Sequence, residues 1–89
     1  MTKEKTMQRK QFYRIVHKSA NHFVDNRPTK RAPTVEYTSD EESSKRFIED
    51  DFDIIDIDWE EHELIECETT RIKIDRKRRV SFSDRKNTI

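Results

Sequence analysis

The chain has 89 residues and a mass of 10.9 kDa, which leaves room for one small domain. Charged residues make up 43% of it and hydrophobic residues 30%, and Leu, Ile, Val and Phe together number 19, about 21% of the chain. Burying a large apolar side chain contributes roughly 1.5–3 kcal/mol, whereas ordering one backbone residue costs roughly 1–2 kcal/mol. The composition therefore predicts a mostly intrinsically disordered protein with a few short elements.

Missing residue types exclude several classes of function. The chain has no glycine, on which phosphate-binding loops and strand-to-helix nucleophile turns depend. Cys67 is the single cysteine, and His17, His22 and His62 lack zinc-ligand spacing. No apolar run is long enough for a signal peptide or a transmembrane helix. We therefore expect no catalytic residue, metal or cofactor, and a nuclear or cytoplasmic protein that is monomeric when free.

The net charge of zero hides three blocks of charge. Residues 1–34 carry nine cations and two anions, residues 35–70 two cations and fifteen anions, and residues 71–89 eight cations and two anions. This pattern predicts a basic segment, an acidic segment and a basic tail. The acidic segment could fold back on either basic arm, at a strength that salt screens within about 8–10 Å, or all three could stay solvated.

Residues 6–24 are predicted to form an amphipathic α-helix, because apolar side chains recur there near helical spacing. Pro28 would end this helix, and residues 26–38 are predicted to be an extended linker. A basic amphipathic helix can lie on a membrane, a nucleic acid or a partner groove, and it can also pack on the chain's own residues. The apolar positions are Phe12, Ile15, Val16, Ala20, Phe23 and Val24.

Ser39-Asp40-Glu41-Glu42 has the pattern of a capping box and predicts a short helix through Phe47 and Ile48. The same residues have the spacing of a kinase site. Ser39, followed by three acidic residues, resembles a casein-kinase-two target, which implies that it is phosphorylated.

Alternation predicts a weak β-hairpin further along the chain. Ile65 and Cys67 alternate with glutamates, and residues 72–74 alternate in the same way. A turn near residues 69–70 would let Glu66 and Glu68 face Arg71 and Lys73. The hairpin lacks the Asn-Gly or Asp-Gly turn that would strengthen it.

The acidic block contains an aliphatic cluster, residues 52–59, with two mutually exclusive interpretations as a binding motif. Residues 54–57, Ile-Ile-Asp-Ile, resemble a SUMO-interacting motif, and residues 52–55, Phe-Asp-Ile-Ile, resemble the motif that binds ubiquitin-like autophagy adaptors. Both imply strand addition to a groove with a basic rim. Alternatively, the apolar residues form the chain's own small cluster against the N-terminal helix. These residues are Phe52, Ile54, Ile55, Ile57 and Trp59.

Residues 77–82, Lys-Arg-Arg-Val-Ser-Phe, place two apolar side chains directly after a run of cations. In an extended backbone Val80 and Phe82 point to the same side, so both could enter pockets while the main chain pairs with a partner's sheet edge. The segment resembles the RVxF docking motif of subunits that regulate type-1 protein phosphatase. That resemblance implies docking through Val80 and Phe82, with Lys77, Arg78 and Arg79 adding electrostatic attraction.

Ser81 lies within this motif and also has the Arg-Arg-x-Ser form that basophilic kinases favour. A phosphate would add roughly −1.5 to −2 charges in the middle of the docking strand. Phosphorylation of Ser81 would therefore weaken docking, as the resemblance also implies.

Sequence alone thus favours a disordered regulator of type-1 protein phosphatase. Residues 78–84 are similar to the phosphatase-recruiting segment of kinetochore scaffolds, and residues 76–82 to the N-terminal arm of insect mRNA export receptors. The second similarity fits an alternative, a nuclear protein whose basic arms bind RNA or DNA. Such binding would weaken steeply with salt and would not need Val80 or Phe82.

Overall fold

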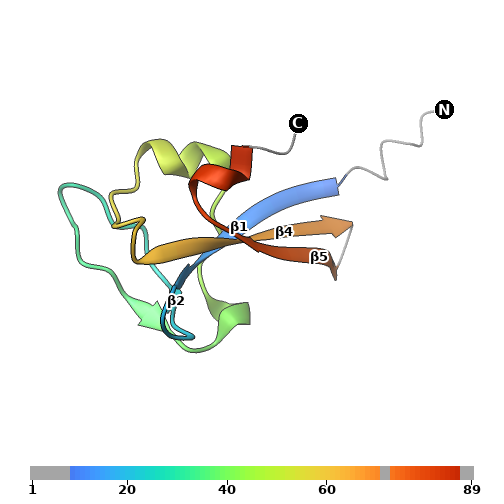
Figure 1. The fold of residues 1–89 in the computed structure, drawn as a ribbon, viewed down its shortest axis with the longest axis horizontal. Coiled ribbons are helices and arrows are strands. Elements are labelled where there is room, and N and C mark those ends of the chain that lie inside the picture. Colours follow the sequence, from blue (N-terminus) through green and yellow to red (C-terminus); the bar gives the residue numbers. More distant parts are fainter. Residues whose placement is uncertain (1–8, 71–72, 87–89) are drawn as a thin grey trace.

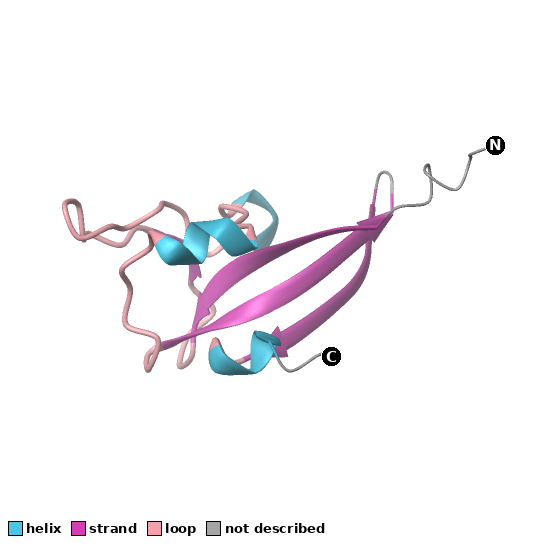
Figure 2. Ribbon diagram, turned by 90° about the horizontal axis from the view of Figure 1, so that it is seen from above, coloured by secondary structure: helices cyan, strands magenta, loops and turns pink. Residues whose placement is uncertain are grey.

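A five-stranded antiparallel sheet organises the described part of the chain, residues 9–70 and 73–86 of a computed structural model (Figure 1). The strand order is β3-β2-β1-β4-β5, so β3 and β5 are the edges. Among the described residues, three short 3-10 helices flank the sheet, and η4, near the C-terminus, lies across the strands from the other two (Figure 2). The strands are β1 (Arg9–His17), β2 (Phe23–Val24), β3 (Tyr37–Thr38), β4 (His62–Thr70) and β5 (Lys73–Val80), and the 3-10 helices are η2 (Glu41–Ser43), η3 (Glu49–Asp53) and η4 (Ser83–Lys86).

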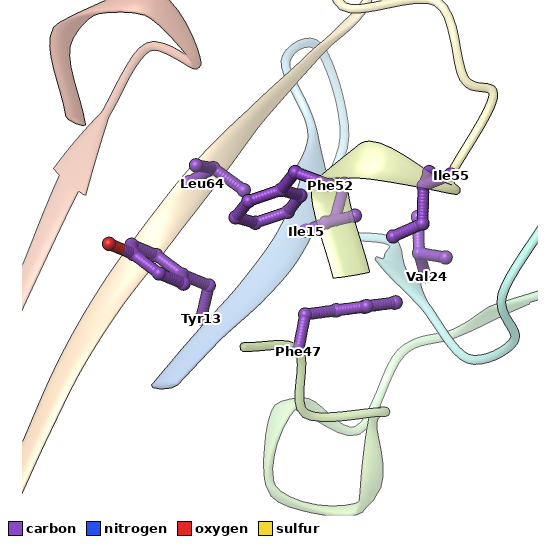
Figure 3. Close-up of a cluster of buried hydrophobic side chains, with 7 residues drawn as sticks. All are labelled: Tyr13, Ile15, Val24, Phe47, Phe52, Ile55 and Leu64. Atoms are coloured by element: carbon purple, nitrogen blue, oxygen red, sulfur yellow. The ribbon is translucent and has the colours of Figure 1, made fainter. Parts of the chain in front are cut away.

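The predicted disorder is wrong, because the few apolar residues of the chain gather around the sheet. The radius of gyration is 14.1 Å, near the roughly 12 Å of a folded chain of this length and far from the roughly 30 Å of an unfolded one. A first core cluster collects residues from five separate segments (Figure 3). Its buried members are Tyr13, Ile15, Val24, Phe47, Phe52, Ile55 and Leu64.

The predicted helix over residues 6–24 is also wrong where it is described, since this stretch contains β1 and β2. β1 lies between β2 and β4 and is buried on both faces. Tyr13 and Ile15 belong to the first core cluster, whereas Phe12 and Val16 belong to a second cluster. A strand with two apolar faces shows no simple alternation, and the two apolar pairs of β1, Phe12-Tyr13 and Ile15-Val16, lie three residues apart and imitate helical spacing.

The second core cluster lies on the other face of β1. Besides Phe12 and Val16 it contains Phe23, Ile65 and Cys67, with Ile74 packed against it. Arg14 is 1% exposed on this side, and its Nη2 donates to the carbonyl oxygen of Glu42 over 3.2 Å. This contact fixes the loop that carries η2 against β1.

The predicted hairpin is a longer pair, β4 with β5, and its expected register is wrong. Glu66 lies opposite Arg78, and Glu68 lies opposite Arg76. The register shifts by one residue at Glu68/Thr69, where β5 holds Asp75 as an extra residue. This bulge lets Ile74 pack on the second core cluster, on the same side as Cys67. The expected turn partner Arg71 lies outside the described residues.

Two loop predictions also need correction. The capping helix is only the single turn η2, and its N-cap is Asp40, whose Oδ1 accepts the N–H of Glu42 over 3.1 Å. Phe47 instead forms an isolated antiparallel bridge with Tyr13. Residues 26–38 are not a bare linker, because Pro28 is fully buried and β3 lies within them. Within residues 9–70 and 73–86, no helix is long and apolar enough to cross a bilayer.

Candidate binding site along strand β5

The outer edge of β5 is the most distinctive surface of the sheet. β5 is eight residues long, and among the described residues only β4 pairs with it. Alternate N–H and C=O groups of an antiparallel edge strand face away from its neighbour and can pair with another chain. The opposite edge, β3, is only two residues long. β5 therefore offers the longer template for strand addition.

Three cations of β5 are half-exposed and ion-paired. Lys77 Nζ lies 2.8 Å from Glu41 Oε2, and the Lys77 side chain is 48% exposed. Arg78 donates from Nη2 to Glu66 Oε1 over 2.9 Å, and its Nε also reaches this oxygen. Arg79 Nε donates to Glu63 Oε1. The basic run of the sequence is thus largely neutralised by carboxylates of the same chain.

These pairs belong to a wider pattern. Five Lys or Arg ion pairs between described side chains each join the acidic block, residues 35–70, to one of the two basic blocks. The acidic middle of the chain therefore contacts both basic ends. These pairs are Arg27–Asp51, Lys77–Glu41, Arg78–Glu66, Arg79–Glu63 and Arg85–Glu49.

Val80 and Phe82, the predicted docking residues, point into the fold. Val80 lies opposite Leu64 in β4, and both Val80 and Phe82 pack against the first core cluster. The ring of Phe82 stacks on Trp59 at a centroid distance of 4.1 Å and meets Phe52 edge-on at 5.5 Å. The two side chains that an RVxF partner would bind are therefore already packed within the chain, Val80 on the first core cluster and Phe82 also on Trp59.

Arg85 holds this aromatic arrangement in place. Its side chain is 7% exposed, and its Nε donates to Glu49 Oε2 over 2.9 Å. Its guanidinium carbon lies 4.0 Å from the centroid of the Phe82 ring, and Nη1 donates to the Phe82 carbonyl oxygen over 2.8 Å. Sequence reasoning missed Arg85, although a cation three residues after a conspicuous aromatic residue is a detectable signal for such a contact.

The two predicted phosphorylation sites lie in different settings. Ser81 is half-buried, and its Oγ accepts the N–H of Asp84 over 3.2 Å at the start of η4. Ser39 is exposed in the bend between β3 and η2. Phosphorylation of either residue stays a prediction.

The four residues of the predicted ubiquitin-like binding motifs do not share an open strand. Phe52 and Ile55 are buried in the first core cluster, and Ile57 packs against it. Ile54 is 56% exposed and has helical dihedral angles, φ −110° and ψ −33°. Three of the four side chains thus belong to the chain's own cluster, which packs on β1 and not on an N-terminal helix.

Other titratable groups are part of the scaffold. Burial raises the pKa of the Cys67 thiol, and burial with the nearby Glu49 carboxylate raises the pKa of Tyr13 to about 12. The Tyr37 hydroxyl lies 2.7 Å from His62 Nε2, and His62 Nδ1 donates to the Asp58 carbonyl oxygen over 2.8 Å. In the described ranges, no group of three His, Cys, Asp or Glu side chains could hold a metal ion.

The amino-acid sequence matches the model of one known protein family. A model described as a hypothetical protein of unknown function, DUF2483, matches residues 7–81. The chain belongs to the DUF2483 family. This match spans every strand from β1 to β5, so the edge strand is part of the DUF2483 domain. No curated protein and no solved structure matches this DUF2483 chain.

Proposed function

We propose that this DUF2483 protein is a binding module that pairs the outer edge of β5 with an extended segment of a partner protein. The observation that carries the proposal is an eight-residue edge strand with an unpaired outer side among the described residues. Strand addition gives affinity through main-chain hydrogen bonds and specificity through alternate side chains. The protein then acts by binding and not by catalysis.

The distribution of charge favours a protein partner over a nucleic acid. β4 and β5 together carry five cations and four carboxylates, a surplus of one cation. Binding to phosphate backbones depends on cations that can replace the counterions of the nucleic acid. Lys77, Arg78 and Arg79 already have carboxylate partners, and a phosphate backbone would have to displace several of these at once, including the buried Glu66.

Docking on type-1 protein phosphatase through Val80 and Phe82 stays a separate prediction. It requires Phe82 to leave Trp59 and Arg85, and Val80 to leave the core. Edge pairing needs neither movement. A Val80→Ala/Phe82→Ala variant cannot separate docking from folding, because both truncations remove core contacts.

A test of edge pairing uses the full chain, labelled with 15N, and two ten-residue peptides. One peptide alternates Thr with Val, and the other alternates Thr with Glu, so that both carry the strand-favouring Thr at every second position and differ in the charge of the other face. For each peptide, a matched control carries N-methyl groups on alternate amides, which removes the hydrogen bonds of one strand edge. Amide chemical shifts report where each peptide binds.

We expect at least one unmethylated peptide to shift the amides of residues 73–80, and its methylated control to leave them unchanged. Shifts confined to other residues, or equal shifts with the methylated control, would overturn the proposal. Parallel titrations with duplex DNA and with the phosphatase catalytic subunit distinguish the two competing functions. Salt-sensitive DNA binding, or phosphatase binding that moves the Trp59 indole signal, would favour those functions instead.

A further inference from the structure

We infer that the partner segment is acidic and that its carboxylate takes the position on Lys77 that Glu41 now occupies. The inference rests on the proposed pairing along β5 and adds the chemistry of the partner. It starts from an ion pair that spans 36 residues, between Lys77 Nζ in β5 and Glu41 Oε2 in η2, at 2.8 Å.

The Glu41 carboxylate is held at the edge by a firmly anchored turn. The carbonyl oxygen of Glu41 accepts the hydroxyl of the buried residue Ser44 over 2.6 Å. The next carbonyl, that of Glu42, accepts Nη2 of the buried Arg14 over 3.2 Å. The backbone of η2 is thus fixed, and only the Glu41 side chain needs to move away from Lys77.

Lys77 is suited to exchange one carboxylate for another. Its side chain is 48% exposed, whereas that of Glu41 is 27% exposed. An exposed ion pair of this kind contributes little to stability, so breaking it takes little from the binding free energy of a partner. By contrast, Arg78 pairs with Glu66, a side chain only 10% exposed, and breaking that pair would leave a buried charge.

The excess of cations over carboxylates in β5, five against one, also disfavours a second copy of the chain as the occupant. Antiparallel pairing of two β5 strands would place Arg and Lys residues of one copy against those of the other. Like charges directly opposite each other destabilise a sheet, and charged edge strands resist self-pairing for this reason. A segment with a carboxylate on the face of β5 that carries Lys77 would meet this cation with opposite charge once the Glu41 side chain has moved away.

The test compares the affinity of the acidic Thr-Glu peptide for four proteins: wild type, Glu41→Gln, Lys77→Gln and the control Glu36→Gln. Glu36 is exposed and precedes β3, at the opposite edge of the sheet. We expect Glu41→Gln to bind about 1.5- to fivefold more tightly, because the competing carboxylate is gone. Glu36→Gln should match the wild type, and Lys77→Gln should bind more weakly.

The neutral Thr-Val peptide separates this inference from the proposed function. If both peptides shift β5 amides with equal affinity, or if Glu41→Gln binds the acidic peptide no better than Glu36→Gln, the acidic partner is refuted while edge pairing stands. If neither peptide shifts the β5 amides of any variant, edge pairing fails and the inference fails with it. Amide shift dispersion in each variant shows that the fold is retained.

Discussion

Truncation of Phe82 tests whether the end of β5 belongs to the core. A buried Phe→Ala change costs about 3–5 kcal/mol, and for the partly buried Phe82 we expect about 2–4 kcal/mol. Phe82→Ala removes the stack on Trp59, the edge contact with Phe52 and the cation–π contact with Arg85. A domain of this length has a stability of about 4–13 kcal/mol, so the loss is a large fraction of it.

Urea unfolding followed by Trp59 fluorescence measures this loss, and Phe82→Leu serves as the matched control. Leu keeps most of the buried apolar surface but loses the ring contacts, so we expect a cost of about 1 kcal/mol. A change below about 0.5 kcal/mol for Phe82→Ala, the value typical of a surface substitution, would refute the reasoning. Phe82 would then be a solvated side chain, free to dock elsewhere.

Three further predictions concern buried polar groups. The raised pKa of Tyr13 means that the folded chain holds this proton more tightly than the unfolded chain, so stability should be intact below pH 10 and fall as the pH rises toward 12. Ultraviolet titration should show one phenol ionising near pH 12, and Tyr13→Phe should remove it. Cys67 is fully buried, so a disulfide reagent should modify it only at the rate of unfolding, and equal rates with and without urea would contradict its burial. Arg78→Ala leaves Glu66 without its ion-pair partner and should cost about 1–3 kcal/mol in urea unfolding. Adding Glu66→Gln should restore part of that loss, and no recovery would contradict the pairing.

Composition misled the prediction of disorder because it counts apolar residues without saying where they meet. Only 30% of the chain is hydrophobic, yet Phe47, Phe52 and Ile55 bring the acidic block onto β1 and β4. The high charge content also opposes folding less than the composition suggests, because carboxylates of the acidic block pair with cations of the basic ends. Such long-range pairings are invisible to a sequence pattern.

Local sequence patterns predicted the β4–β5 pairing in part and missed β1, and the difference has a physical reason. The β4–β5 pairing was partly foreseeable, since β4 alternates around Ile65 and Cys67, but the bulge at Asp75 shifts its register. β1 was not foreseeable as a strand, because both of its faces are buried. For the candidate site, the sequence pointed to strand addition at residues 77–82, but it could not show that Phe82 faces Trp59.

Hydrogen exchange of the full chain, with and without the acidic Thr-Glu peptide, tests the central claim most directly. Without peptide, we expect slow exchange in β1 and β4, and fast exchange in the alternate β5 amides that face away from β4. The peptide should slow that outward-facing set, because each of these amides gains a hydrogen-bond partner. Fast exchange throughout β1 and β4, or outward-facing β5 amides that stay fast when the Thr-Glu peptide and, in a parallel run, the Thr-Val peptide are saturating, would contradict a folded sheet that binds through this edge.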